Sequence, residues 1–345
     1  MAEHGGNIYN KKNLKIDFSA NINPFGISEN VRKALYNSVD NINCYPDPLC
    51  TEIRRKAADF HGTEPENIVF GNGGADIIFR LVNAVKPHKA VVPVPSFAEY
   101  HEALSQSGCE TVNYFINHDN FRINYDILDM LKRDIDMIIL CIPNNPTGQL
   151  TDENLLFEII HKAYENNILV FADECFIDMT DNPQKYSVFK YIRKYSNIFI
   201  LKSMTKMYAV PGLRLGYGIS SDTELIEKIR KSGQPWPVNS MAAAAGAAMF
   251  DDSEYRNRFI SYLADEREFM YNELKKTGLE VFRPSADYIF FHSRNNTDIY
   301  EKLLEKGIMI RDCSDYKCLS EGYYRIAVKK HDENKILLEA LKEIL

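Results

Sequence analysis

Short apolar runs alternate with amphipathic segments through the first two thirds of the chain. The runs are rich in Val, Ile and Phe, which is typical of strands that are buried on both faces. They fall at residues 68–70, 89–93, 136–142, 168–172 and 198–201. Segments with helical character fall between them at 76–84, 97–106 and 153–166. This alternation predicts an α/β fold whose parallel sheet is covered by helices on both faces.

The pattern changes after about residue 235. It predicts helices at 239–250, 254–276, 297–305 and 333–344, and strands at 288–292 and 323–328. Such a mixture indicates a smaller α+β domain. We therefore predict three parts: an N-terminal arm that packs with the small domain (1–40), a large domain (41–235) and the small domain itself (236–345).

Composition narrows the function classes. The 345 residues carry a net charge of −7, with 45% hydrophobic and 26% charged residues, as in ordinary soluble proteins. An acidic balance counts against general nucleic-acid binding, and no apolar run is long enough to span a bilayer. The N-terminus lacks the pattern of a secretory signal. The seven cysteines are scattered without metal-ligand spacing, so we expect a cytoplasmic enzyme without a bound metal.

A lysine follows the predicted strand at 198–201. Lys206 lies in a hydroxyl-rich loop, Ser203-Met204-Thr205-Lys206, and Arg214 comes eight residues later. In a pocket, a lysine amine can lose its proton and form a Schiff base with an aldehyde. The hydroxyl groups and the guanidinium would suit a phosphate. A lone lysine is usually a solvated surface group, but this combination suggests pyridoxal phosphate.

Three more candidates follow strand-like runs. Gly73, Gly74 and Ala75 open a helix, where backbone N–H groups can bind an anion. Asn145 follows the run at 136–142 and could donate to a phenolate oxygen. Asp173 ends a buried strand, where its carboxylate needs a partner such as a protonated pyridine nitrogen. Taken singly, each could be an ordinary turn or a salt bridge.

Together, these motifs resemble the fold-type I pyridoxal-phosphate enzymes, which belong to the class I and II aminotransferase superfamily. The resemblance covers nearly the whole chain and implies pyridoxal 5'-phosphate as cofactor. It also implies a large domain with a mostly parallel seven-stranded sheet flanked by helices, beside a smaller α+β domain. The motifs occur in the family's order: Asn145-Pro-Thr-Gly, Asp173-Glu174, Ser203-x-Thr205-Lys206 and Arg214-x-Gly216.

The resemblance implies a role for each matched residue. Lys206 would attach the cofactor, Asp173 would pair with its ring nitrogen, and Asn145 would donate to its ring hydroxyl. An aromatic residue would stack on the ring: Phe97, or Tyr100 as the second choice. The groups that hold the phosphate would be Gly73, Gly74, Ala75, Ser203, Thr205 and Arg214.

Three further residues are assigned by the family pattern. Tyr45 resembles the tyrosine that reaches the cofactor phosphate of a neighbouring subunit, which implies a homodimer with shared active sites. Arg325 matches the arginine that binds the substrate α-carboxylate, although an arginine in a strand can also be solvated. Phe176 stands where many relatives have a tyrosine that bonds the ring oxygen, so one donor is missing.

Within the superfamily, the chain resembles the histidinol-phosphate aminotransferase group, and most of all its threonine-phosphate decarboxylases. In that subfamily the N-terminal arm resembles a lid, so that His4 would reach a substrate phosphate and Asn23 the amino acid. Arg311, fourteen residues before Arg325, would add a second cation for a substrate with two anionic groups. A disordered His4 and an Arg311 that pairs only with Asp312 are the alternatives.

Two activities follow from this resemblance. The first is decarboxylation of a small phosphorylated amino acid, L-threonine-O-3-phosphate, to (R)-1-aminopropan-2-yl phosphate for cobalamin synthesis. The second is transamination of histidinol phosphate or a related amino acid with 2-oxoglutarate. A cofactor-binding regulator is disfavoured because no residues remain for a DNA-binding domain.

Overall fold

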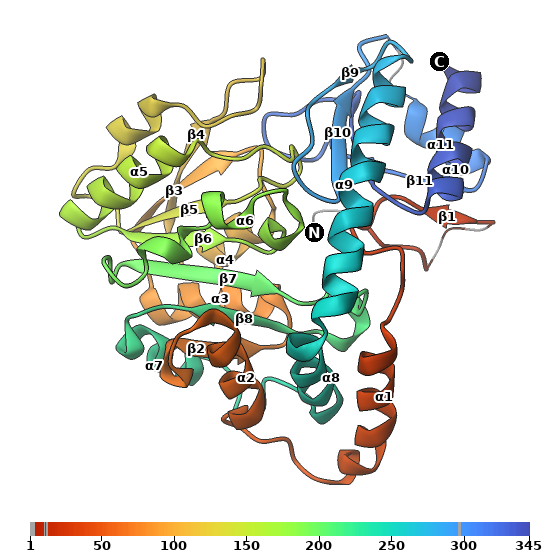
Figure 1. Cartoon of the computed structure of the whole chain (residues 1–345). Coiled ribbons are helices and arrows are strands. Elements are labelled where there is room, and N and C mark those ends of the chain that lie inside the picture. Colours follow the sequence, from red (N-terminus) through yellow and green to blue (C-terminus); the bar gives the residue numbers. More distant parts are fainter. Residues whose placement is uncertain (1–3, 10, 12, 296–297) are drawn as a thin grey trace.

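The computed structural model describes residues 4–9, 11, 13–295 and 298–345 (Figure 1). A seven-stranded sheet with the order β2-β8-β7-β6-β5-β3-β4 forms the centre of its larger part. Only β8 runs against its neighbours in this sheet, which confirms the mostly parallel sheet of the predicted fold. The strands are β2 (Ile68–Gly71), β3 (Lys89–Val94), β4 (Glu110–Phe115), β5 (Met137–Cys141), β6 (Leu169–Asp173), β7 (Ile198–Ser203) and β8 (Gly216–Ile219).

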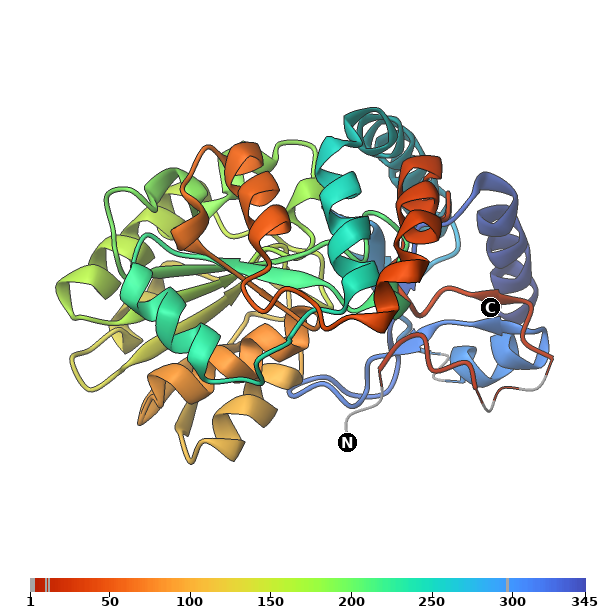
Figure 2. The same ribbon diagram turned by 90° about the horizontal axis from the view of Figure 1, so that it is seen from below.

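Helices cover both faces of this sheet, as the apolar strands require. Alternate strand residues such as Val92 and Phe199 pack with α3, α4 and α7, whereas Val91 and Ile200 belong to the opposite core with α2 and α5. Figure 2 shows these two layers of helices above and below the strands. The helices are α2 (Thr51–His61), α3 (Gly74–Val85), α4 (Glu99–Gln106), α5 (Glu153–Glu165), α6 (Pro183–Tyr186), α7 (Thr223–Lys231) and α8 (Ser240–Asp251).

A second, antiparallel sheet lies beside the first, with the order β12-β13-β10-β9. Its strands β10 and β13 coincide with two predicted strands; the start of the predicted helix at 297 lies outside the described residues. The domain boundaries stay a prediction. The elements of this part are α9 (Ser253–Lys275), β9 (Glu280–Val281), β10 (Tyr288–His292), α10 (Ile299–Glu305), β11 (Ile308–Met309), β12 (Arg311–Asp312), β13 (Tyr323–Ala327) and α11 (His331–Ile344).

The N-terminal arm joins the smaller sheet to the larger one. Its strand β1 (Ile16–Asp17) pairs in parallel with β11, and the Phe18 backbone exchanges hydrogen bonds with Met309 and Ala327. The chain then continues into α1 (Glu29–Ser38), which packs against α8. Ser28 caps α1 by accepting from the backbone N–H of Val31. The segment between β1 and α1 is thereby held between the two sheets.

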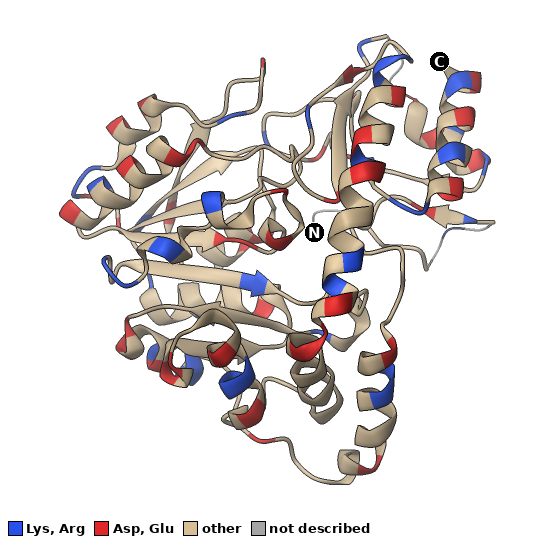
Figure 3. Cartoon of the chain, in the orientation of Figure 1, with Lys and Arg blue, Asp and Glu red and all other residues tan. Residues whose placement is uncertain are grey.

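Charged residues of both signs are spread over the helices of the smaller part. Figure 3 shows positions of cationic and anionic residues interspersed along the ribbon of α9 and α11, without a continuous basic stretch on these helices. Among the described helices, none combines the length and the apolar character that crossing a bilayer requires.

Candidate active site

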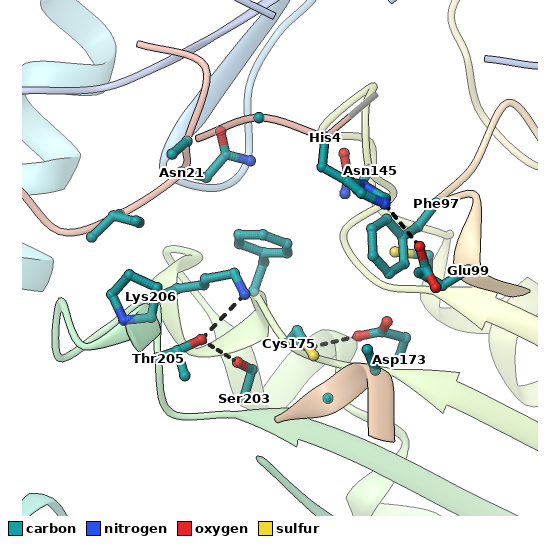
Figure 4. A pocket seen from close by; sticks show the side chains of 18 of the residues that line it. His4, Asn21, Phe97, Glu99, Asn145, Asp173, Cys175, Ser203, Thr205 and Lys206 are labelled. Carbon is teal, nitrogen blue, oxygen red and sulfur yellow. Dashed lines mark hydrogen bonds and ion pairs between the residues drawn. The ribbon is translucent and has the colours of Figure 1, made fainter. Parts of the chain in front are cut away.

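The carboxyl ends of β5, β6 and β7 open into a cavity of about 450 Å³. Open α/β sheets commonly bind their ligands at this edge. Elements far apart in the sequence complete the walls: the start of α3, the segment before α4, the arm, and residues of the smaller sheet. Figure 4 shows the side chains that point into it.

Lys206 lies at the centre of this cavity, three residues after β7. Its Nζ lies 3.2 Å from Thr205 Oγ1, which is itself 2.9 Å from Ser203 Oγ (Figure 4). Nζ also lies 6.0 Å from the centre of the Phe176 ring. The amine is therefore held by one hydroxyl contact and an aromatic wall, and it faces the cavity.

Asp173 lies at the floor of the cavity and is 6% exposed. Its Oδ2 accepts a hydrogen bond of 2.6 Å from the Tyr100 hydroxyl, and its Oδ1 accepts one of 2.9 Å from the Cys175 backbone N–H. Burial, and then the Asp173 carboxylate, raise the pKa of Tyr100 well above its ordinary value, so Tyr100 remains a donor. Two donors thus fix the direction of a buried carboxylate.

The glycine turn before α3 provides room for an anion. Gly73 has a φ of +88°, and a Cβ on this residue would lie 2.7 Å from Arg214 Nη2. A Cβ on Gly216 would lie 2.7 Å from the Gly74 backbone nitrogen. Since Gly73 offers no capping side chain, the first N–H groups of α3 stay available beside the Arg214 guanidinium. Gly74, Ala75, Ser203, Thr205 and Arg214 all line the cavity.

These features fit pyridoxal phosphate. The glycine turn gives a phosphate close access to backbone donors and a guanidinium, and Lys206 offers an amine for its aldehyde. Asp173 offers a buried carboxylate for its ring nitrogen. Phe97 and Asn145 also line the cavity, as predicted for residues that contact the ring.

Arg325 reaches the cavity from β13 and is 5% exposed. Its Nη2 donates to the Ser19 carbonyl at 2.8 Å, its Nη1 donates to Asn145 Oδ1, and its Nε has no hydrogen-bond partner among the described residues. A guanidinium held in this way presents a fixed fork, which suits a carboxylate. Arg325 is therefore buried and oriented, unlike a solvated strand arginine.

Arg311 and His4 also line the cavity. Arg311 Nη2 contacts both oxygens of Asp315 at 2.8 Å, and its Nη1 donates to the Asp312 carbonyl. Its charge is therefore compensated by Asp315 rather than by the Asp312 carboxylate. His4 Nε2 lies 2.8 Å from Glu99 Oε1, so the arm is in contact with α4 (Figure 4).

Three predicted residues do not line the cavity: Gly73, which lies behind Arg214, Asn23 and Tyr45. The Asn23 side chain is buried and donates to the Met207 carbonyl at 2.8 Å, so that it supports the lysine loop from behind. Tyr45 is 81% exposed and stacks on Trp236, with ring centroids 4.6 Å apart. The substrate contact of Asn23 and the partner contact of Tyr45 stay predictions.

Other residues of the cavity were not predicted. Asn21 and Ser19 come from the arm, and Tyr316 comes from the loop after β12. Tyr316 donates to Asn145 Oδ1 at 3.4 Å, whereas Phe176 has no hydroxyl and packs edge-on against Tyr288. No pattern in the sequence distinguishes Ser19, Asn21 and Tyr316 from other loop residues.

A second buried carboxylate lies close to this site. Asp287 is 1% exposed, and neither carboxylate oxygen has a hydrogen-bond partner among the described residues. Burial raises its pKa from 3.8 to about 6, against the opposing influence of Arg325, Lys206 and Lys329. An ionised carboxylate in this place costs stability.

We expect Asp287→Asn to stabilise the protein in a pH-dependent way. Because the pKa of Asp287 is higher in the folded chain than in the unfolded chain, folding favours the protonated carboxyl group. The ionised carboxylate therefore lowers the free energy of unfolding by its full amount above pH 6, and it has no effect below about pH 4. At pH 7 the variant should gain up to about 3 kcal/mol in the free energy of unfolding. Urea unfolding at pH 7 and pH 4 measures both values. An equal gain at the two pH values would contradict this origin.

The sequence and the fold both have known relatives. The family model of class I and II aminotransferases matches residues 13–341. A threonine-phosphate decarboxylase of Salmonella typhimurium is 36% identical over 352 residues, which cover 99% of this chain and 96% of the relative. A histidinol-phosphate aminotransferase of Archaeoglobus fulgidus is 31% identical over 332 residues, with 96% and 99% covered.

A solved structure agrees with these matches. The histidinol-phosphate aminotransferase of Clostridium acetobutylicum superimposes with a TM-score of 0.91 at 30% identity, covering 96% of this chain and 99% of that one. Sequence, fold and cavity therefore lead to one conclusion. The chain belongs to the class I and II aminotransferase family, and it is an enzyme that depends on pyridoxal 5'-phosphate.

Proposed function

We propose that the protein decarboxylates L-threonine-O-3-phosphate to (R)-1-aminopropan-2-yl phosphate, a reaction of cobalamin synthesis. The observation that carries this choice is the likeness to the Salmonella threonine-phosphate decarboxylase over 99% of the chain. The cavity supports it, because Arg325 and Arg311 are both buried and both line it. Two guanidinium groups suit a substrate with a carboxylate and a phosphate.

Transamination is the second candidate. The likeness to histidinol-phosphate aminotransferases at 31% identity favours it, and two arginines would also suit the two carboxylates of 2-oxoglutarate. The two activities differ in the bond that breaks at the substrate Cα. Decarboxylation releases the carboxylate as CO₂, whereas transamination removes the Cα proton.

Different residues of the cavity would have different roles in either reaction. When bound, the cofactor supplies an electron sink for the charge left at Cα. Asp173 would keep a proton on the ring nitrogen, and the hydrogen bond from Tyr100 keeps this carboxylate in place. Arg325, fixed by Ser19 and Asn145, would orient the substrate carboxylate. This orientation decides which bond at Cα breaks.

Lys206 would move the proton. Its amine would return a proton to Cα after CO₂ has left, or take the proton from Cα in transamination. The absence of a hydroxyl at Phe176 leaves Asn145 to contact the ring oxygen. The arm, whose His4 contacts Glu99, would exclude water from the site.

The homodimer is part of this proposal. The stacked pair of Tyr45 and Trp236 is exposed, at 81% and 40% of the two side chains, and other exposed apolar residues precede it at Tyr36, Val39 and Ile42. An exposed apolar patch of this kind favours contact with another protein surface. A second copy of the chain would cover it, and Tyr45 would then enter the partner's active site.

The test uses the holoenzyme and O-phospho-L-threonine without a keto acid. We expect each enzyme molecule to form many molecules of 1-aminopropan-2-yl phosphate and CO₂, because decarboxylation regenerates the cofactor and needs no second substrate. Mass spectrometry measures the products. A single turnover, or none, would contradict the proposal. Turnover of histidinol phosphate with 2-oxoglutarate would then establish the aminotransferase.

A further inference from the structure

A buried ion pair lies behind the active site, on the opposite face of the large sheet. Glu174 is fully buried and Lys202 is 5% exposed, and Lys202 Nζ lies 3.2 Å from Glu174 Oε2. Side chains alternate between the two faces of a strand. Asp173 and Leu201 line the cavity, so the residue after each of them faces away from it. Neither Glu174 nor Lys202 lines the cavity, and neither can touch a ligand there.

Both charges of this pair have further partners. The Val188 backbone N–H donates to Glu174 Oε1 at 2.7 Å, and the Ser187 hydroxyl donates to Glu174 Oε2 at 2.8 Å. Asp178 Oδ1 lies 3.2 Å from Lys202 Nζ. Burial lowers the pKa of Lys202, but the carboxylates of Asp178 and Glu174 outweigh burial and raise this pKa above its ordinary value. The ammonium group is therefore charged in its buried place.

A buried ion pair contributes little to the net stability of a fold. Taking two charges out of water costs about as much free energy as their attraction contributes, and apolar residues of similar volume often pack as stably. Separating the two charges inside the protein is much less favourable than separating two apolar groups, because little water is present to screen them. The pair therefore holds the segments that carry it in one relative position.

These segments are the ends of the two strands that carry the cofactor residues. Glu174 follows Asp173 at the end of β6, and Lys202 lies in β7, four residues before Lys206. The Glu174 backbone N–H also donates to the Leu201 carbonyl at 2.9 Å. A displacement of the backbone at Glu174 or Lys202 would therefore displace the neighbouring cofactor residue as well.

The reverse side of the lysine loop is not closely packed. A second cavity of about 570 Å³ lies there, and Lys202, Ser203, Met204 and Met207 form part of its wall. The remaining wall comes from α2, from α6 and the segment after it, from the end of α8 and from the first turns of α9. Dense packing normally resists the displacement of a segment in a protein interior. Because this loop has a cavity behind it, the ion pair and the Asn23 contact support it instead.

We propose that Glu174 and Lys202 are positioning residues for the cofactor. The ion pair between them holds the ends of β6 and β7 so that Asp173 is aligned with the ring nitrogen and Lys206 with the aldehyde. Neither is a catalytic residue, because neither reaches the cavity. The inference rests on the dependence of the family on pyridoxal phosphate, and it is independent of the choice between decarboxylation and transamination.

Four variants and one control test this role. Lys202→Met and Glu174→Gln each remove one charge, and the double variant removes both. Lys202→Arg keeps a cation beside the two carboxylates. Glu266→Gln is the matched control, because Glu266 is also a buried carboxylate, at 6% exposed, and accepts from Asn334 at 3.0 Å. It lies on α9 and does not line the cavity.

Three quantities are measured on each variant of the full chain. The first is the affinity of the cofactor-free protein for added pyridoxal phosphate. The second is the pH at which the visible absorbance of the holoenzyme changes. The third is the urea concentration at which the cofactor-free protein unfolds.

We expect the double variant to unfold at about the parent's urea concentration, since it leaves no uncompensated buried charge, but to bind pyridoxal phosphate about tenfold more weakly. Its absorbance change should shift to higher pH. A ring nitrogen that Asp173 holds less firmly in its protonated form opposes a proton on the Lys206 nitrogen less strongly. The single variants should show the same two effects and also unfold more easily. Lys202→Arg should keep both cofactor properties of the parent, and Glu266→Gln should change only the unfolding.

A double variant with the cofactor affinity and the absorbance titration of the parent would overturn the proposal, because the ion pair would then be only structural. Equal cofactor losses in Glu266→Gln would overturn it too. Should the double variant not fold, Glu174→Gln decides on the same two criteria, since it keeps the shape of the side chain and leaves Asp178 beside Lys202. None of these measurements uses a substrate, so their outcome is separate from the test of the reaction.

Discussion

Replacing Lys206 by alanine is expected to remove the visible absorbance of the holoenzyme and to lower turnover by about 10³-fold or more. The Lys206 amine is the group in the cavity that can bond to the cofactor aldehyde, and Asn23, which donates to the Met207 carbonyl, holds its loop from behind. The substitution removes both the covalent attachment of the cofactor and the amine that moves the proton at the substrate Cα. Absorbance spectra and steady-state turnover of the purified variant measure the two effects.

Thr205→Ala is the matched control for this prediction. The Thr205 hydroxyl lies 3.2 Å from the Lys206 amine, and it also contacts Ser203. Its removal disturbs the position of the amine but leaves the amine present. We therefore expect the absorbance to persist, with weaker cofactor binding and a small loss of turnover. A Lys206→Ala protein that keeps its absorbance band would show that another lysine binds the cofactor.

The strands that position this site could be predicted because they are buried on both faces. Runs such as the one at 136–142 are continuous in apolar residues, and they match β5, β6 and β7. Two strands of the same sheet were not predicted. β4 is an edge strand with mostly half-exposed residues, and β8 is a short antiparallel strand that contains Gly216 and Gly218. Both lack the apolar run that marks a central strand.

Because the buried strands can be recognised as apolar runs, the site residues at their ends can be predicted as well. Asp173 and Ser203 end buried strands, and Lys206 follows one, so their place at one sheet edge follows from the fold. Arg325 lies in the smaller sheet, and its assignment came from the resemblance. The contact between Tyr100 and Asp173 joins the first turn of α4 to the end of β6. Only the packing of α4 against the sheet brings these two groups together.

The Asp173–Tyr100 pair gives the second large effect. Asp173→Asn should lower kcat by about 10²- to 10³-fold, because an amide cannot hold a proton on the ring nitrogen by its charge. The buried place of the carboxylate makes its charge effective, since little water screens it there. Cofactor binding should weaken as well. Steady-state kinetics with saturating cofactor separate the loss in kcat from the loss in affinity.

Tyr100→Phe distinguishes the charge of Asp173 from its position. The variant removes the hydrogen bond of 2.6 Å but leaves the carboxylate, the Cys175 N–H contact and the aromatic ring. If charge is the main contribution, kcat should fall by about tenfold or less, far less than in Asp173→Asn. Adding Tyr100→Phe to Asp173→Asn should then cause little further loss, because the two residues act through one carboxylate. Equal losses in the two single variants would instead mean that the direction of the carboxylate, fixed by Tyr100, matters as much as its charge.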